Sequence, residues 1–200
     1  MFDGKFRTAV DARTAPIGKT LVKLGFSADA LTGSGLLFAG ATGWAIGTGR
    51  HLLAVVLLTL TGAHDLLDGP VAKASKLSSK RGSFFDSVID RVSDALILGG
   101  VAYFLVAQQR GELVLLPFAI MTTTFMISYQ RSKAESLGLE AKGGLMERAE
   151  RMILMGVALL HHSLFIPVLW LLLILTAFTA IGRFLRVWKA ATELIRTEAN

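Results

Sequence analysis

Five aspartates interrupt apolar segments of the chain, and their spacing suggests metal chemistry. Asp65 and Asp68 lie three residues apart and Asp86 and Asp90 lie four apart, so each pair shares one face of a helix. Carboxylates within membrane-spanning segments are costly and usually mark a functional site. Four of them converging from two helices can hold one or two hard divalent cations such as Mg²⁺. We therefore predict a metal site here, with Asp94, one turn beyond Asp90, in a supporting role.

The residues around these aspartates favour a ligand-binding role over a purely structural one. Intramembrane acids could instead pair with Arg91 or Lys73, but such pairs would account for one or two carboxylates and not for four. Gly69 follows Asp68 directly, so the backbone is uncovered where a ligand must approach. The connection between the two helices is basic and suited to phosphate, with the cations Lys73, Lys76, Lys80 and Arg81.

The composition is that of a membrane protein with several spans. The 200 residues are 52% hydrophobic and include no cysteine, which excludes disulfides, zinc–thiolate centres and a cysteine nucleophile. Residues 1–24 have the pattern of a basic amphipathic helix in the membrane interface. We predict an all-α integral membrane protein with a single domain over 1–200, in which this helix precedes a six-helix transmembrane core at 31–188. The expected spans are 31–48, 52–74, 83–107, 113–138, 145–161 and 164–188.

The basic residues predict the orientation of these spans. Of the 21 Lys and Arg, 18 fall in four clusters, at 5–23, 73–81, 131–151 and 183–196. With six spans these clusters lie on one side of the membrane, which the positive-inside rule makes cytoplasmic. Both termini and the aspartate site are therefore expected on the cytoplasmic side of the cell (inner) membrane. The net charge of +6, divided around a membrane domain, favours membrane lipids as partners and not nucleic acid.

The aspartate segment resembles the signature of the CDP-alcohol phosphotransferase (CDP-alcohol phosphatidyltransferase class I) family, D-x2-D-G-x2-A-R-x8-G-x3-D-x3-D. It departs at one position, where Lys73 replaces the usual arginine and keeps the charge without bidentate phosphate recognition. The matching residues are Asp65, Asp68, Gly69, Ala72, Gly82, Asp86 and Asp90. Six spans and an N-terminal interfacial helix are also similar to this family, so the resemblance covers nearly the whole chain.

The resemblance implies metal-dependent transfer of a phosphatidyl group from CDP-diacylglycerol to an alcohol, with release of CMP. It implies that Asp65, Asp68 and Asp86 hold two ions, Mg²⁺ or alternatively Mn²⁺. Asp90 would contribute to one of these ions and act as the catalytic base that deprotonates the acceptor hydroxyl. This chemistry agrees with the residues, because two cations would neutralise a diphosphate and a nearby carboxylate would activate an alcohol.

A second segment, Ser27 to Thr32, resembles the family's S-P-D-x-V-T segment, with Ala28 in place of the proline and Leu31 in place of the valine. In similar synthases this segment contacts the cytidine nucleotide. Asp29 and Thr32 are also placed to cap the first transmembrane helix. The full set of residues expected to bind CDP-diacylglycerol is Asp29, Ala30, Leu31, Thr32, Gly69, Lys73 and Ser79.

A third segment, residues 128–151, concerns the acceptor alcohol and is similar to bacterial phosphatidylinositol-phosphate synthases of this family. The resemblance implies 1D-myo-inositol 3-phosphate as acceptor, giving phosphatidylinositol phosphate and CMP, and an acceptor phosphate needs several fixed cations. The candidates are Arg131, Arg148, Arg151 and Arg183. Alternatively, these arginines pair with Glu147 and Glu150 at helix ends.

Other functions stay open from the sequence. Glycerol-3-phosphate is the alternative acceptor, because phosphatidylglycerophosphate synthases also bind a phosphorylated alcohol with basic residues. A divalent-cation-coupled transporter is a distant alternative, since buried acids among six spans would suit one. Family resemblance also suggests a homodimer, although small residues such as Gly43 and Gly100 can serve packing within one chain equally well.

Overall fold

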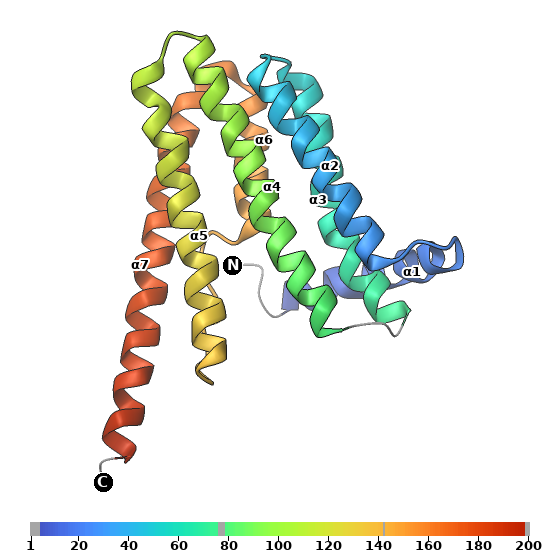
Figure 1. Ribbon diagram of the computed structural model, residues 1–200, viewed down its shortest axis with the longest axis vertical. Helices are drawn as coiled ribbons and strands as arrows, with labels where there is room; N and C mark the ends of the chain where they lie inside the picture. Colours follow the sequence, from blue (N-terminus) through green and yellow to red (C-terminus); the bar gives the residue numbers. More distant parts are fainter. Residues whose placement is uncertain (1–4, 76–78, 142, 199–200) are drawn as a thin grey trace. The chain divides into compact units, whose positions relative to one another are not determined.

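The computed structural model describes residues 5–75, 79–141 and 143–198, and within these ranges all regular structure is helical (Figure 1). This confirms the all-α class. Lys76, predicted to belong to the basic connection, lies outside the described residues. The elements are α1 (Lys5–Lys23), α2 (Ala28–Gly47), α3 (His51–Ala74), α4 (Lys80–Ala107), the 3₁₀ turn η1 (Gly111–Val114), α5 (Leu115–Ser136), α6 (Arg148–Leu160), the 3₁₀ turn η2 (His162–Leu164) and α7 (Phe165–Glu198).

The helix boundaries agree with the predicted segments except at the C-terminus. Helices α2 to α6 begin and end within three residues of the predicted spans. In contrast, α7 continues to Glu198, ten residues past the predicted end. The extension has a simple cause, since residues 183–198 contain no Gly or Pro and are rich in good helix formers.

Three stretches of the described chain are long and apolar enough to cross a membrane: His51–Ala74, Gly111–Ser136 and Phe165–Arg196. They correspond to α3, to η1 with α5, and to α7. The prediction of six spans stays a prediction, because α2, α4 and α6 are not among the helices that meet this measure in the described residues. Helix α6 has 13 residues. At 1.5 Å per residue it is about 20 Å long, less than the roughly 30 Å core of a bilayer.

The described residues form two compact units, one ending at Val114 and the other beginning at Leu115. In the first unit α2 packs against both α3 and α4 (Figure 1). Glycines allow α2 and α4 to approach closely: a Cβ added at Gly100 would lie 2.1 Å from the carbonyl oxygen of Gly43. A Cβ at Gly43 would in turn lie 2.3 Å from the carbonyl oxygen of Leu96. These small residues therefore serve packing within the chain.

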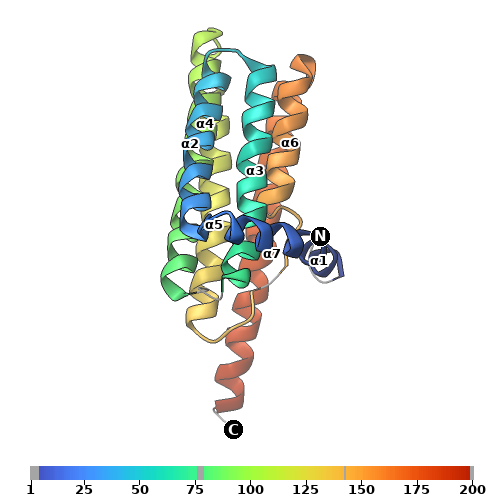
Figure 2. The ribbon, with the colours of Figure 1, turned by 90° about the vertical axis from the view of Figure 1, so that its right-hand side faces the viewer.

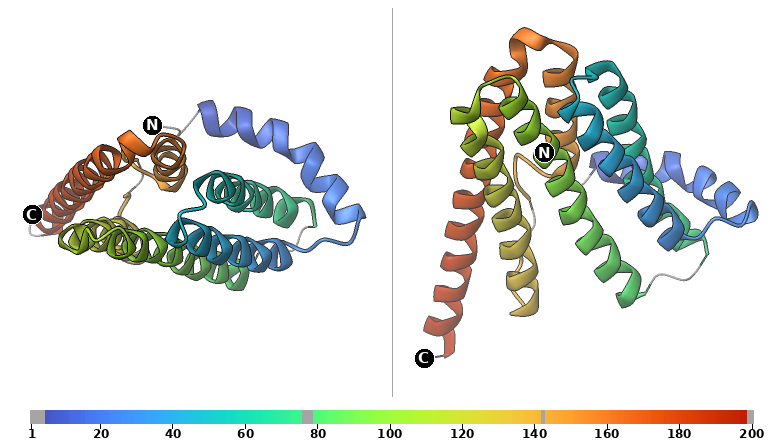
Figure 3. Two further views of the ribbon diagram at one scale, coloured as in Figure 1. Left: turned by 90° about the horizontal axis from the view of Figure 1, so that it is seen from above. Right: turned by 45° about the horizontal axis from the view of Figure 1, so that its top comes forward.

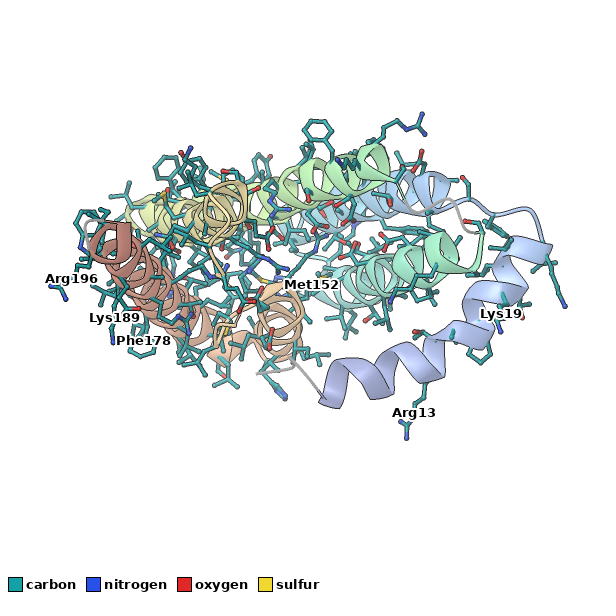
Figure 4. All side chains as sticks on the ribbon, turned by 90° about the horizontal axis from the view of Figure 1, so that it is seen from below. Arg13, Lys19, Met152, Phe178, Lys189 and Arg196 are labelled. Carbon is teal, nitrogen blue, oxygen red and sulfur yellow. The ribbon has the colours of Figure 1, made fainter. Side chains whose placement is uncertain are left out.

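Helix α1 belongs to the first unit and crosses α3 (Figure 2). Figure 3 shows α1 lying flat in a view in which α3 is seen nearly end-on. The crossing point is Gly18, where an added Cβ would lie 2.8 Å from the carbonyl carbon and oxygen of Pro70. Arg13 points away from α3 (Figure 4). This contact fixes α1 beside the aspartate-bearing end of α3, while its position in the membrane interface stays a prediction.

In the second unit α7 packs against both α5 and α6. Leu169 and Leu172 of α7 and Ile120 of α5 are at most 1% exposed and form part of its core. The hydroxyls of Thr123 and Thr176 lie 2.8 Å apart across the α5–α7 contact. Towards its C-terminal end α7 carries cations, and Lys189 and Arg196 project from it in Figure 4.

Candidate functional site

The first unit brings the predicted nucleotide segment next to the aspartates through the start of α2. Ser27 caps this helix, because its side-chain oxygen accepts a hydrogen bond from the backbone amide of Ala30 at 3.1 Å. The prediction that Asp29 and Thr32 cap the helix is therefore wrong. Since α2 begins at Ala28, both residues lie inside it, and their side chains turn to other helices.

Thr32 joins α2 to α3. Its Oγ1 lies 3.2 Å from Oδ2 of Asp68 and 3.1 Å from the carbonyl oxygen of Ala28. The Thr32 side chain is buried. A residue predicted to contact the nucleotide is thus bonded directly to a residue predicted to bind metal.

Asp29 joins α2 to α4. Its carboxylate accepts a hydrogen bond from Nη2 of Arg81, in an ion pair between side chains that are 44% and 83% exposed. Ser79, another predicted nucleotide residue, caps α4 by accepting a hydrogen bond from the amide of Gly82 at 3.0 Å. The N-termini of α2 and α4 are therefore held together at the same end of this unit.

Three of the four predicted metal ligands lie near one another. The carboxylates of Asp86 on α4 and Asp65 on α3 are close enough to Asp68 to repel its negative charge. At Gly69 an added Cβ would meet no heavy atom within 4 Å, so space is open beside Asp68. Carboxylate oxygens are the donors that Mg²⁺ and Mn²⁺ prefer, and mutual repulsion is what a bound cation would relieve. The residues present therefore fit a divalent cation.

The side chains are not drawn together into a finished coordination sphere. Among the described residues, no group of three or more His, Asp or Glu side chains is arranged so as to hold an ion. Oδ2 of Asp90 lies 3.6 Å from Nη1 of Arg91. Pairing with Arg91 was the purely structural role that the sequence left open for one of the carboxylates. Lys73 is exposed near the C-terminus of α3.

The predicted acceptor residues all belong to the second unit. Nε of Arg131 on α5 donates to Oε1 of Glu135 at 3.0 Å, one helical turn away. Arg148 is the first residue of α6. Nη1 of Arg151 donates to the carbonyl oxygen of Met146 at 3.4 Å. All three residues are partly exposed as a whole, but the guanidinium nitrogens of Arg148 are buried.

Arg183 differs from the other three arginines, because it is only 1% exposed. Its Nη1 donates to the carbonyl oxygen of Ile127 at 2.8 Å. Its Nη2 donates to the carbonyl oxygen of Gly143 at 3.1 Å and to Oε1 of Glu147 at 2.6 Å. The Arg183 guanidinium is thus buried and bonded within the protein. Its ion pair with Glu147 is the alternative that the sequence left open for these arginines.

Two arginines form contacts that were not predicted from the sequence. Arg81 was expected to face phosphate as part of a basic connection, and its contact with Asp29, 52 residues earlier, has no local sequence signal. Arg186 donates to the carbonyl oxygen of Gly143 at 2.8 Å and was counted only as one member of a basic cluster. Arg186 follows Arg183 by three residues, and residues so spaced share a helix face. This spacing was the available signal that both arginines could contact the same loop.

Comparisons with known proteins agree with this geometry. A family model described as CDP-alcohol phosphatidyltransferase matches residues 26–188. The archaetidylinositol phosphate synthase of Pyrococcus horikoshii is 36% identical over 182 residues, which cover 90% of this chain and 93% of that protein.

Two crystal structures of the phosphatidylinositol phosphate synthase of Mycobacterium tuberculosis are also similar. The structure with CDP-DAG bound has a TM-score of 0.80 and 25% identity, and the match covers 88% of this chain and 93% of that one. The structure in complex with manganese and citrate has the same TM-score and identity, with 88% of each chain covered.

Proposed function

Because the chain belongs to the CDP-alcohol phosphatidyltransferase family, we propose that it transfers the phosphatidyl group of CDP-diacylglycerol to an inositol phosphate. The products are phosphatidylinositol phosphate and CMP. The observation that carries the proposal is the approach of Asp65, Asp68 and Asp86 beside the start of α2, at the signature spacing of the family. The similar synthases are named after different lipids, an archaetidyl and a phosphatidyl lipid, but both names contain inositol phosphate. This shared part of the names supports inositol phosphate as the acceptor.

We propose that Asp65, Asp68, Asp86 and Asp90 hold two divalent cations, Mg²⁺ or Mn²⁺. The manganese in the similar M. tuberculosis structure supports a divalent cation. When bound, such cations would neutralise the diphosphate and stabilise the departing CMP. Asp90 is the base in this proposal and takes the proton from the acceptor hydroxyl.

The donor nucleotide is proposed to bind at the N-termini of α2 and α4. Thr32 and Asp29 lie there, tied to Asp68 and Arg81 respectively. Gly69 leaves open space beside Asp68, and Lys73 offers an exposed ammonium for the diphosphate. The remaining proposed contacts are Ala30, Leu31 and Ser79. The CDP-DAG in the similar M. tuberculosis structure supports this class of donor.

The acceptor phosphate is proposed to bind to arginines of the second unit. Arg131 and Arg151 are partly exposed, and Arg148 begins α6 with its guanidinium nitrogens buried. Arg183 contributes to the same cluster from a buried position. Several guanidinium groups suit an acceptor that carries a phosphate as well as hydroxyls, because charge-assisted hydrogen bonds to phosphate are stronger than hydrogen bonds between neutral groups.

The membrane arrangement proposed with this function has six spans, α1 in the interface, and both termini and the site on the cytoplasmic side. The distribution of Lys and Arg supports this orientation. A homodimer is proposed on family grounds alone, since Gly43 and Gly100 are used within the chain.

Purified protein given CDP-diacylglycerol, Mg²⁺ and inositol phosphate tests the reaction through release of CMP. We expect CMP to appear in proportion to the new phosphoinositide, and neither product to form without acceptor or in excess EDTA. Failure of CMP release with every phosphorylated alcohol, together with Mg²⁺ uptake into proteoliposomes, would instead favour the transporter.

A further inference from the structure

Helix α1 meets α3 at the level expected for a membrane surface. Its contact on α3, Pro70, follows the first residue of that helix, His51, by 19 residues, which at 1.5 Å per residue is about 28 Å. The hydrocarbon core of a bilayer is about 30 Å thick, and α3 is long and apolar enough to cross it. A helix that lies flat where it crosses α3 at Pro70 (Figure 3) would therefore run along the boundary between hydrocarbon and headgroups.

One side of α1 is used in the contact with α3, and a neighbouring side is exposed and apolar. Thr14 and Gly18, one helical turn apart, are buried. Ile17 is exposed, and so are Leu24 and Phe26 in the connection from α1 to α2. Large apolar side chains exposed at this level are suited to the edge of the hydrocarbon core.

The rest of the exposed surface of α1 is basic. The helix contains five Lys and Arg residues and a single acid, Asp11. Three of its cations, Arg13, Lys19 and Lys23, are exposed, and Arg13 and Lys19 are labelled in Figure 4. Anionic headgroups attract basic side chains that lie close to the membrane surface. Apolar residues flanked by cations are typical of helices that bind an anionic lipid surface.

The contact between α1 and α3 also reaches the proposed metal site. Pro70 has no amide hydrogen, so the carbonyl of Leu66 lacks its usual helical donor and the helix is weakened at this point. Gly18 lies against the Pro70 carbonyl there and supports it from outside. Asp68, two residues before Pro70, accepts a hydrogen bond from the backbone of Gly69. If α1 moved away, the segment that carries Asp68 would lose this support.

We propose that α1 binds an anionic lipid surface and, through Gly18 and Pro70, braces the aspartate-bearing end of α3. The partner is a bilayer that contains anionic phospholipid, recognised by its phosphates and by the edge of its hydrocarbon core. Enzyme activity then depends on the charge of the surrounding membrane as well as on the substrates. Lipid binding by α1 is independent of the reaction, whereas the effect on activity rests on the proposed function, so the two are tested separately.

Lipid binding is tested with nitroxide labels, which need no substrate. The chain has no cysteine, so full-length protein can be labelled at Ile17→Cys on the apolar face or, as a control, at the exposed Ala15→Cys, about 200° away around the helix. The protein is placed in nanodiscs of phosphatidylcholine with or without phosphatidylglycerol. The label at 17 should move deeper, away from a water-soluble nickel chelate and towards dissolved oxygen, when phosphatidylglycerol is present. The label at 15 should stay accessible to nickel. An equal depth of the label at 17 in both lipids overturns anionic lipid binding.

The role of the cations is tested by CMP release at a fixed surface fraction of CDP-diacylglycerol and saturating acceptor. Phosphatidylglycerol should raise the rate of the parent protein. Each cation near an anionic surface strengthens binding about fivefold, so Lys19→Gln/Lys23→Gln should reduce this gain by about fivefold or more. Lys189→Gln/Arg196→Gln removes the same charge from α7 and should keep the gain. A gain retained in the α1 variant, or lost equally in both, overturns the proposal. If no disc releases CMP, the proposed function fails, and the nitroxide depth still decides whether α1 binds anionic lipid.

Gly18→Ala tests the brace apart from lipid binding. The added Cβ would lie 2.8 Å from the carbonyl carbon and oxygen of Pro70, so α1 must shift away from α3. The label at 17 should stay inserted in anionic discs while kcat falls about tenfold or more, because small displacements of a catalytic group are costly. Gly99→Ala, where a Cβ meets nothing within 4 Å, is the matched control and should keep the parent kcat. A parent-like kcat in Gly18→Ala overturns the brace.

Discussion

The hydroxyl of Thr32 and the carboxylate of Asp68 lie 3.2 Å apart, and this contact joins the start of α2 to the aspartates of α3. Thr32 also reaches the carbonyl of Ala28 at 3.1 Å, so its single proton is shared between two acceptors. Asp68 in turn lies near the negative charges of Asp65 and Asp86. The proposed nucleotide and metal sites are thus one connected set of side chains.

Thr32→Val should lower the catalytic efficiency with CDP-diacylglycerol, because valine keeps the shape of threonine and loses the donor to Asp68. A hydrogen bond to a charged group typically contributes about 1.5–3 kcal/mol, so kcat/KM should fall roughly tenfold or more. Thr32→Ser is the matched control, since it keeps the hydroxyl, and it should stay close to wild type. Steady-state kinetics in mixed micelles measures both variants, and a fully active Thr32→Val would show that the contact is dispensable.

Asp→Asn at Asp65, Asp68, Asp86 or Asp90 should remove most activity without unfolding the protein. Each amide keeps the size of the carboxylate and loses the charge that a divalent cation requires. Excess EDTA should have the same effect, reversed by Mg²⁺ or Mn²⁺. Asp94→Asn is the internal comparison and should lose much less. Full turnover in EDTA would be incompatible with the proposed two-cation site.

Neighbouring glycines on α4 should respond in opposite ways to alanine. At Gly100 a Cβ would lie 2.1 Å from the Gly43 carbonyl oxygen, so Gly100→Ala must separate α2 from α4 and should cost about 1–3 kcal/mol. At Gly99 a Cβ meets nothing within 4 Å, so Gly99→Ala should be neutral or stabilising by up to about 1 kcal/mol through helix propensity. Thermal unfolding in detergent measures both, and equal Tm values would contradict the α2–α4 packing.

Much of the fold could be read from the sequence because apolar periodicity and the breaks at Gly25, Gly49 and Gly138 mark the helix ends. The aspartate pairs could be read as well, since their helical spacing fixes a common face. Which of two adjacent glycines, Gly99 or Gly100, meets another helix could not be read, because that depends on the rotation of α4 about its axis.

Hydrogen-bond and ion-pair partners that are distant in the sequence could not be predicted either. Asp29 looked like a helix cap, but Ser27 starts the helix and Arg81 captures the Asp29 side chain. From the sequence, Arg183 was one cation of a basic cluster and a candidate for binding the acceptor phosphate, and its burial could not be predicted. Arg183 is buried because the loop around Gly143 lies against α7 and supplies acceptors for its guanidinium. Such partners arise from tertiary packing, which local propensity does not encode.

Lys73→Ala should raise the KM for CDP-diacylglycerol and leave that for the acceptor unchanged, because the exposed ammonium is proposed to meet the donor diphosphate. Lys73→Arg restores the family residue, and its planar guanidinium can bind two phosphate oxygens, so donor binding should be equal or better. Separate titrations of donor and acceptor measure the split. If Lys73→Ala raised only the KM for the acceptor, Lys73 would bind the acceptor and not the donor, against this prediction.

A competition experiment tests the central claim most directly. Purified protein is given CDP-diacylglycerol, Mg²⁺, and equal concentrations of inositol phosphate, glycerol-3-phosphate and free inositol, and the lipid products are identified by mass spectrometry. We predict that phosphatidylinositol phosphate dominates, and that free inositol is not used because its missing phosphate leaves the arginines without their counter-charge. Predominant phosphatidylglycerophosphate, or efficient formation of phosphatidylinositol, would contradict the account.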